Sequence, residues 1–227
     1  MSTVAIIQAR MGSSRLPNKM LLHLHGYPIC EWVFRRVQQA KNVDHIIFAI
    51  PDTKNDDVLA FYLQSIRANL YRGSETDLVE RYYLAAKQAG ADQIVRICAD
   101  NPLVSASEIE RLVDFFESES CDYAYNHIPK ENHYPDGLGA EICSMQLLEA
   151  IQKNTTSSEH REHLFNFIWD NQSDYSIKTF EPPDEIAYPE LKLDLDTMDD
   201  YQRLLVKPYR LNMSANEVIQ TALQHKA

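Results

Sequence analysis

Residues 4–21, VAIIQARMGSSRLPNKML, join an apolar run to a loop that carries three cations. The run at residues 3–9 is short, apolar and β-branched, which predicts a buried strand. The loop contains a glycine, two serines and a proline, and Arg10, Arg15 and Lys19 lie in it with no carboxylate before Glu31. Such a concentration of positive charge is unusual in a chain whose formal net charge is -11. We therefore expect the loop to bind something anionic.

The first half of the chain alternates between apolar runs and amphipathic segments. Strands are expected at residues 3–9, 45–50, 69–73 and 93–99, and helices at residues 28–40, 55–66, 76–90 and 105–118. This alternation predicts an α/β fold in which helices cover both faces of a mainly parallel sheet. Right-handed crossovers then leave a ligand crevice at the carboxyl ends of the strands.

The second half is less regular. Prolines and glycines interrupt the apolar runs of residues 122–144, which indicates a hairpin excursion around residues 125–143. The later pattern predicts a helix at 157–171, a strand at 175–181, and a strand that passes into a helix at 191–205. No repeat or linker interrupts the chain, so we expect a single domain over residues 1–227.

The composition limits the class of partner. The 227 residues include 33 Asp and Glu against 22 Lys and Arg, and this acidic balance argues against a nucleic-acid partner. The four cysteines are far apart and form no CxxC pair, which favours a reduced cytosolic chain. The N-terminus does not resemble a signal peptide, and no apolar run reaches membrane-spanning length. The expected protein is cytoplasmic, without a membrane partner.

The loop after the first strand is suited to phosphate. Gly12, Ser13 and Ser14 allow close approach of backbone N–H groups, and the three cations can neutralise a polyphosphate. A solvated basic loop that pairs with surface carboxylates explains the composition equally well. The chain lacks the GxxxxGK[ST] and GxGxxG motifs, which disfavours P-loop NTPases and dinucleotide dehydrogenases.

Three aspartates are candidate metal ligands. Asp100 follows the strand expected at 93–99, and Asp194 and Asp196 alternate, so that both face the same side of a strand. Carboxylates from two strand ends suit Mg²⁺ when the ion also takes phosphate oxygens. Helix capping is the alternative role for Asp100, at the turn before Pro102, and for Asp196, before the helix that follows Thr197.

Several ordered segments resemble the nucleotidyltransferases that activate acidic sugars with CTP. These are the acylneuraminate and KDO cytidylyltransferases and especially their spore-coat polysaccharide (SpsF-type) relatives. The segments are IIQARMGSSRLPNKML, YRGSETDLVERYY, IVRICADNPLV, YPDGLGAEICS, EHREHL and LDLDTMDD, which together extend along nearly the whole chain. The resemblance implies a Rossmann-like fold of the nucleotide-diphospho-sugar transferase type. It also implies transfer of CMP from CTP to an acidic sugar or related acceptor, with release of pyrophosphate, in surface-polysaccharide or glycan biosynthesis.

The resemblance also implies roles for individual residues. The catalytic set comprises Arg10, Arg15, Lys19 and Asp100. The nucleotide-binding set comprises Ala9, Arg10, Met11, Gly12, Ser13, Ser14, Arg15, Lys19, Arg72, Ser74, Asp77 and Ala99, with Arg81 just behind. Mg²⁺ is expected on Asp100 and Asp196, and the acceptor on Asp136, Glu141, Arg161 and His163. A homodimer is expected to form around residues 125–141.

The chain departs from the family pattern at three places. Gly139 and Ala140 stand where an acid and an apolar residue are usual, Asn101 replaces a small or sulfur-bearing residue, and Asn18 replaces a glycine before Lys19. These differences leave the acceptor open. The alternatives are a nucleotidyltransferase that uses another nucleotide or a phosphorylated acceptor, and a non-catalytic nucleotide-binding relative. His160 and His163 form no HExxH motif, so zinc is not expected.

Overall fold

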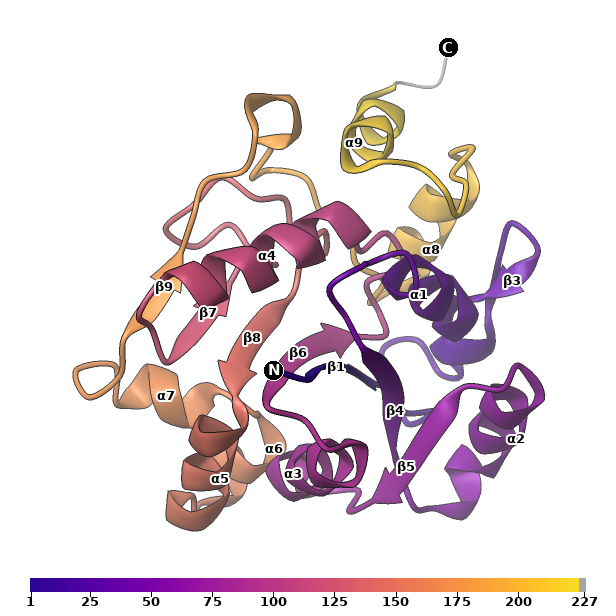
Figure 1. The fold of residues 1–227 in the computed structure, drawn as a ribbon. Coiled ribbons are helices and arrows are strands. Elements are labelled where there is room, and N and C mark those ends of the chain that lie inside the picture. Colours follow the sequence, from indigo (N-terminus) through magenta and orange to yellow (C-terminus); the bar gives the residue numbers. More distant parts are fainter. Residues whose placement is uncertain (225–227) are drawn as a thin grey trace.

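The computed structural model describes residues 1–224, and one seven-stranded sheet forms its centre (Figure 1). The strand order is β5-β4-β1-β6-β8-β7-β9. The strands are β1 (Thr3–Gln8), β4 (His45–Pro51), β5 (Asn69–Gly73), β6 (Gln93–Cys98), β7 (Tyr123–Tyr125), β8 (Glu141–Ser144) and β9 (Ile177–Thr179), and β2 (His23–Leu24) with β3 (Tyr27–Pro28) forms a separate pair.

The sheet is mainly parallel. Strands β5, β4, β1 and β6 run parallel to one another, and β9 is parallel to β7. Strand β8 is antiparallel to both of its neighbours, β6 and β7. The α/β fold with a mainly parallel sheet, expected from the alternation, is confirmed.

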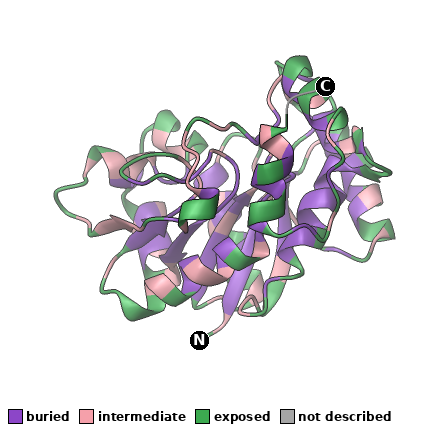
Figure 2. Ribbon diagram, turned by 90° about the horizontal axis from the view of Figure 1, so that it is seen from above, coloured by how far each residue is buried: buried purple, intermediate pink, exposed green. Residues whose placement is uncertain are grey.

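Helices cover both faces of the sheet, and the sheet separates two apolar cores. Val4 and Ile6 of β1 belong to one core, and Ala5 and Ile7 belong to the other, so this strand is apolar throughout because both of its faces are buried. The core that contains Ala5 and Ile7 also contains residues of α1 (Ile29–Val37), α2 (Asp57–Ser65), α4 (Ala106–Ser118), α8 (Met198–Leu205) and α9 (Ala215–Leu223). The core that contains Val4 and Ile6 also contains residues of α3 (Leu78–Ala89), α5 (Met145–Asn154) and α7 (Asn166–Asp170). Figure 2 shows the buried strands between helices whose outer faces are exposed.

The remaining helices are short. They are α6 (Ser158–Glu162) and the 3₁₀ turns η1 (Lys19–Leu21), η2 (Lys54–Asp56) and η3 (Asp184–Ile186). The helix expected at 157–171 is wrong as a single element, because the chain breaks at His163, whose backbone is extended (φ -122°, ψ 101°). Sequence analysis also did not predict α5 or α9.

The expected strand at 191–195 is extended chain with one isolated bridge between Asp136 and Lys192. Its backbone bonds go to two loops instead of a strand: Leu193 donates to the carbonyl of Asp136, and Leu195 donates to that of Asp100. These hydrogen bonds bring residues 193–195 to the carboxyl end of β6.

Residues 126–140 connect the antiparallel strands β7 and β8 by a largely buried loop. The side chain of Asn126 donates to the carbonyl of Glu108 and accepts from the backbone N–H of Ala140. A Cβ at Gly139 would lie 2.2 Å from the Asn126 side chain, so this position has no room for the acid that the family pattern has there.

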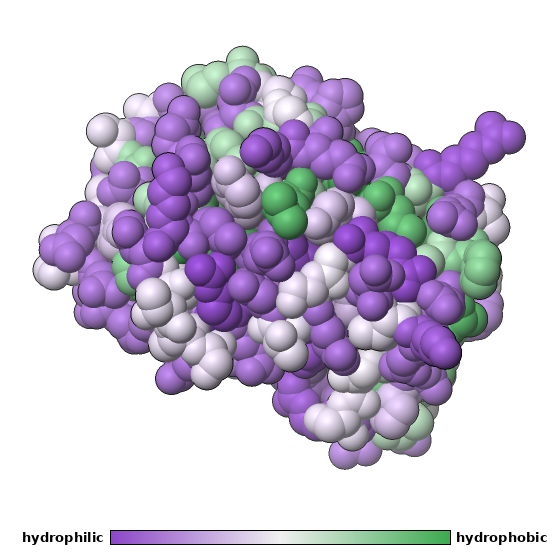
Figure 3. All heavy atoms as spheres, turned by 90° about the horizontal axis from the view of Figure 1, so that it is seen from below, coloured by the Kyte–Doolittle hydropathy of each residue, from purple (hydrophilic) through white to green (hydrophobic). Residues whose placement is uncertain are grey.

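The four cysteines carry free thiols. Within residues 1–224 we find no helix with the length and apolar character that crossing a membrane requires. The face in Figure 3 is largely hydrophilic, with apolar residues in small separate patches.

Candidate active site

A cavity of about 230 Å³ lies at the carboxyl ends of β1 and β6. It brings together much of the predicted site. The predicted residues that line it are Ala9, Arg10, Ser13, Ser14, Arg15, Lys19, Ala99, Asp100, His163 and Asp196. The basic loop after β1 and the two candidate metal ligands therefore share one cavity, although Asp196 is 177 residues from Lys19.

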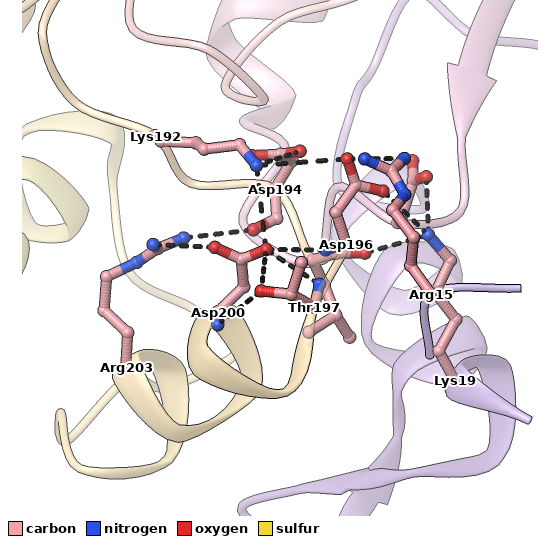
Figure 4. Close-up of polar contacts among 10 residues, drawn as sticks. Arg15, Lys19, Lys192, Asp194, Asp196, Thr197, Asp200 and Arg203 are labelled. Atoms are coloured by element: carbon pink, nitrogen blue, oxygen red, sulfur yellow. Dashed lines mark hydrogen bonds and ion pairs between the residues drawn. The ribbon is translucent and has the colours of Figure 1, made fainter. Parts of the chain in front are cut away.

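Lys19 connects the two aspartates, and Figure 4 shows its side chain with that of Asp196. Its ammonium Nζ lies 2.9 Å from Asp100 Oδ2 and 3.2 Å from Asp196 Oδ1, and it donates to the carbonyl of Leu195 at 2.9 Å. Arg15 reaches the other oxygen of Asp196, with Nη2 and Oδ2 2.9 Å apart. Arg15 and Lys19 are therefore paired with carboxylates from distant segments of the chain, Asp100 and Asp196.

The backbone of the basic loop is held by a buried carboxylate. The Met11 N–H donates to Asp56 Oδ1 at 2.8 Å, and the Thr53 hydroxyl donates to Asp56 Oδ2 at 2.6 Å. Met11 is itself buried and Gly12 is exposed, and neither lines the cavity. The contact of Asp56 with a loop 45 residues away had no local signal in the sequence.

Asn18 explains why a glycine is usual before Lys19. Its backbone has φ 60° and ψ 20°, in the left-handed region. Glycine adopts this conformation without strain, and asparagine adopts it more readily than most other residues. The substitution therefore preserves the turn that leads into η1 and to the Lys19 ammonium.

Asp200 fixes the backbone beside Asp196. Thr197 is the N-cap of α8, and Asp200 Oδ2 accepts from the backbone N–H groups of Asp196 and Thr197 at 3.0 and 2.8 Å. Burial raises the pKa of the Asp200 carboxyl, but the hydrogen bonds from Thr197 and Asp196 outweigh it, and the net pKa is well below the ordinary value. The capping role considered for Asp196 belongs to Thr197, which leaves the Asp196 carboxylate to the cavity.

Asp194 pairs with a second lysine, Lys192. Lys192 Nζ lies 3.4 Å from Asp194 Oδ2 and 3.9 Å from Asp196 Oδ2, so the two aspartates do share one side of the chain. Burial, followed by the nearby carboxylate of Asp136, raises the pKa of Asp194 to about 6. Asp194 Oδ1 is buried and has no hydrogen-bond partner among residues 1–224.

The Asp194→Asn variant should be more stable than the parent near pH 7. Because the folded-state pKa lies above the unfolded value, the folded chain binds the proton more tightly, and Asp194 costs stability increasingly as the pH rises from about 4 to about 6. We expect a gain of about 1–2 kcal/mol at pH 7 and a much smaller one at pH 4. Urea unfolding at both pH values measures it; an equal effect at both pH values would contradict this assignment.

The segment expected to bind the nucleotide, residues 71–83, does line the cavity, but with other residues than Arg72, Ser74 and Asp77. Arg72 pairs with Asp52 and Asp57 at 3.0 and 2.8 Å, Ser74 accepts from the Asp77 N–H, and Asp77 caps α3. None of these three residues lines the cavity, and their role at the nucleotide stays a prediction. The cavity is lined instead by Glu75, Thr76, Leu78 and Arg81.

On the acceptor side, His163 and its neighbour Glu162 line the cavity. Arg161 does not, because its guanidinium donates to the carbonyls of Gln152 and Thr155 at the end of α5, where a cation is favoured.

Asp136 and Glu141 also lie outside the cavity lining. Asp136 forms the bridge to Lys192, and Glu141 is buried in β8. Sequence analysis missed Gln8 and Arg96, which do line the cavity. A charged residue within the apolar strand IVRIC was the available signal for Arg96.

The cavity fits a divalent cation held by two carboxylates. Asp100 and Asp196 converge on one positive charge, the Lys19 ammonium, within 3.2 Å. Within the part of the chain that the structure describes, no cluster of three or more His, Cys, Asp or Glu side chains is arranged to hold a metal. A cation here would therefore depend on ligand oxygens as well, as Mg²⁺ bound with phosphates does.

Comparison with known proteins identifies a family. Residues 4–209 match the sequence model of the family described as Cytidylyltransferase. An uncharacterised protein of Methanocaldococcus jannaschii is 34% identical over 205 residues, covering 90% of this chain and 82% of its own. The spore coat polysaccharide biosynthesis protein SpsF of Bacillus subtilis is 27% identical over 223 residues, covering 94% and 91%.

Two further similarities concern chemistry and fold. The 8-amino-3,8-dideoxy-manno-octulosonate cytidylyltransferase of Shewanella piezotolerans is 31% identical over 124 residues, which is 54% of this chain and 51% of that protein. The solved structure of a cytidylyltransferase from Leptospira borgpetersenii superposes with a TM-score of 0.88 at 26% identity, covering 100% of this chain and 98% of that one.

Proposed function

We propose that the acceptor of this chain is an acidic sugar or a related acid. The chain belongs to the cytidylyltransferase family and is a CTP-dependent nucleotidyltransferase. The observation that carries the proposal is one cavity that is lined both by the basic loop after β1 and by the carboxylates of Asp100 and Asp196. Support for an acid comes from a relative named for an octulosonate, which is a sugar acid. The proposed product is a CMP-sugar for surface-polysaccharide or glycan biosynthesis.

The cationic residues of the loop serve the triphosphate in this proposal. An acceptor oxygen attacks the α-phosphorus, and pyrophosphate leaves in line. Arg10, Arg15 and Lys19 hold the β- and γ-phosphates and stabilise the charge that develops on the leaving group. Backbone N–H groups of residues 12–14 share this task. Such a reaction depends on positioning and charge neutralisation more than on covalent chemistry by the protein.

Asp100 and Asp196 hold Mg²⁺ in this proposal. When bound, the ion neutralises phosphate oxygens of the reacting nucleotide. Thr197 and Asp200 support this role through the chain itself, because they fix the backbone of Asp196 and leave its carboxylate oriented toward the cavity.

Two finer expectations, a cytoplasmic location and a homodimer formed around residues 125–141, stay predictions. Most of that segment is buried in its own chain, and its exposed residues are Pro129, Lys130, Glu131 and His133. A contact between two copies in this region would have to use these side chains.

The proposed reaction is tested by pyrophosphate release. The purified chain is incubated with Mg²⁺ and CTP, or with ATP, GTP or UTP, and with 3-deoxy-manno-octulosonate, its 8-amino-8-deoxy analogue or N-acetylneuraminate. We expect release that requires both CTP and one of the acids, and none with neutral sugars. Tight CTP binding without turnover on any acceptor would favour a non-catalytic relative. Release with a sugar 1-phosphate alone would overturn the acceptor class.

A further inference from the structure

Arg96 is a charged residue in the middle of an apolar strand. It lies on β6, where β8 pairs antiparallel and places Glu141 directly opposite. Its Nη1 donates to Glu141 Oε2, and its Nε donates to Gln8 Oε1 at 3.2 Å. The ring of Phe165 lies 5.9 Å from its Cζ. These contacts hold the guanidinium in one orientation.

Glu141, which holds Arg96, is itself buried and supported from behind. The Tyr123 hydroxyl donates to Glu141 Oε1 at 2.6 Å, and His127 Nε2 lies 3.7 Å from Oε2. Burial raises the pKa of Glu141, but the charge of Arg96, followed by His127 and Tyr123, outweighs it, and the net pKa is lowered. Glu141 is therefore a carboxylate that fixes Arg96, and both of its oxygens are already used within the protein.

The guanidinium still has donors to offer. Arginine has five N–H groups, and those of Nη2 donate to no residue in the described chain. The side chain keeps 17% of its surface exposed and lines the cavity together with Gln8 and His163. A buried ion pair contributes little to stability by itself, so an Arg–Glu pair with donors left at a cavity suggests a role in binding.

The position of Arg96 fits the acceptor better than the triphosphate. Arg15 and Lys19 lie at the end of the cavity where Asp100 and Asp196 converge. Arg96 lies within β6, two residues before the strand ends, whereas Asp100 lies in the turn beyond it. Its planar fork matches a carboxylate, which it binds by paired hydrogen bonds.

We propose that Arg96 binds the carboxylate of the acceptor, and that Glu141 is the positioning residue that fixes its guanidinium. The inference rests on the proposed function for the reaction in which the bound acid takes part. Glu141, which was expected to contact the acceptor directly, acts in this proposal through Arg96. Tyr123 acts through Glu141 in the same way, and Gln8 orients Arg96 from the side of β1.

The chain offers a matched control network. Arg111, Glu108 and Tyr134 form a second arginine, glutamate and tyrosine group, in which Arg111 Nη1 and the Tyr134 hydroxyl lie 2.8 and 2.7 Å from Glu108 Oε2. None of these three residues lines the cavity. Substitution in this group reports the structural cost of breaking such a network without touching the proposed acceptor site.

Equilibrium binding tests the inference separately from turnover. The probe is 3-deoxy-manno-octulosonate, with its methyl ester as the neutral analogue, titrated into the protein in the presence of CTP without a divalent cation. We expect the parent chain to bind the acid at least tenfold more tightly than the ester. Arg96→Lys should lose about tenfold to a hundredfold in affinity for the acid and little for the ester or for CTP. Arg111→Lys should leave all three affinities unchanged.

Positioning by Glu141 has its own signature. Glu141→Gln and Tyr123→Phe should raise the KM for the acid with little change in the KM for CTP, whereas Glu108→Gln should not. If Glu141→Gln does not fold, Gln8→Ala provides the same KM test. Equal binding of acid and ester by the parent, or unchanged acid binding by Arg96→Lys, would overturn the inference. Acid binding that depends on Arg96 without pyrophosphate release would instead contradict the proposed function alone.

Discussion

We expect replacement of Asp100 or Asp196 by asparagine to lower turnover by about a hundredfold or more while the fold is retained. Both carboxylates lie within 3.2 Å of one positive charge in the cavity, so each supplies negative charge where a cation is to be held. Asparagine keeps the size and one oxygen but removes the charge. Loss of a preorganised electrostatic contact of this kind typically costs two to three orders of magnitude in turnover.

The measurement is steady-state pyrophosphate release with CTP, Mg²⁺ and the active acceptor, together with thermal unfolding of each variant. Asp199→Asn is the matched control, because Asp199 is exposed on the same segment and does not line the cavity. We expect the control to retain parental turnover. Near-normal turnover of both Asp100→Asn and Asp196→Asn would show that these carboxylates do not hold a metal needed for the reaction.

The general position of this site followed from the sequence because the pattern there is strong. Val4 to Ile7 are buried on both faces, so β1 is apolar without interruption, and parallel strands place their carboxyl ends at one edge. The loop that begins at Arg10 and the turn at Asp100 therefore had to meet. The resemblance added Asp196, which local pattern alone could not bring to the same edge.

The direction of individual side chains was much less predictable. Arg161 and Arg72 were expected at ligands, but each finds partners on its own chain, at the carbonyls that end α5 and at Asp52 with Asp57. Glu141 was expected to contact the acceptor from a hairpin around residues 125–143, and it is buried in β8 opposite Arg96. These outcomes depend on the insertion of β8 between β6 and β7, which no local periodicity encodes.

Lys19 provides the second large effect. The residue is 8% exposed, and Asp100, Asp196 and the carbonyl of Leu195 hold its ammonium. In the Lys19→Met variant two carboxylates would face each other without their shared cation, which is strongly unfavourable for partly buried groups. The variant also loses a charge proposed to hold the triphosphate. We expect turnover to fall by about a hundredfold to a thousandfold.

Thermal unfolding of the same variant distinguishes the effect of the lysine from that of the metal without a measurement of turnover. Without divalent cations, Lys19→Met should unfold at a lower temperature than the parent, and Mg²⁺ should restore much of the loss, because the ion can take the position between Asp100 and Asp196. The parent should respond less to Mg²⁺ alone, since its lysine already neutralises the pair. Lys178→Met, which breaks the exposed pair with Glu119, is the control and should respond to Mg²⁺ only as the parent does. If Mg²⁺ stabilises the parent as much as Lys19→Met, the ammonium and the metal do not share a site.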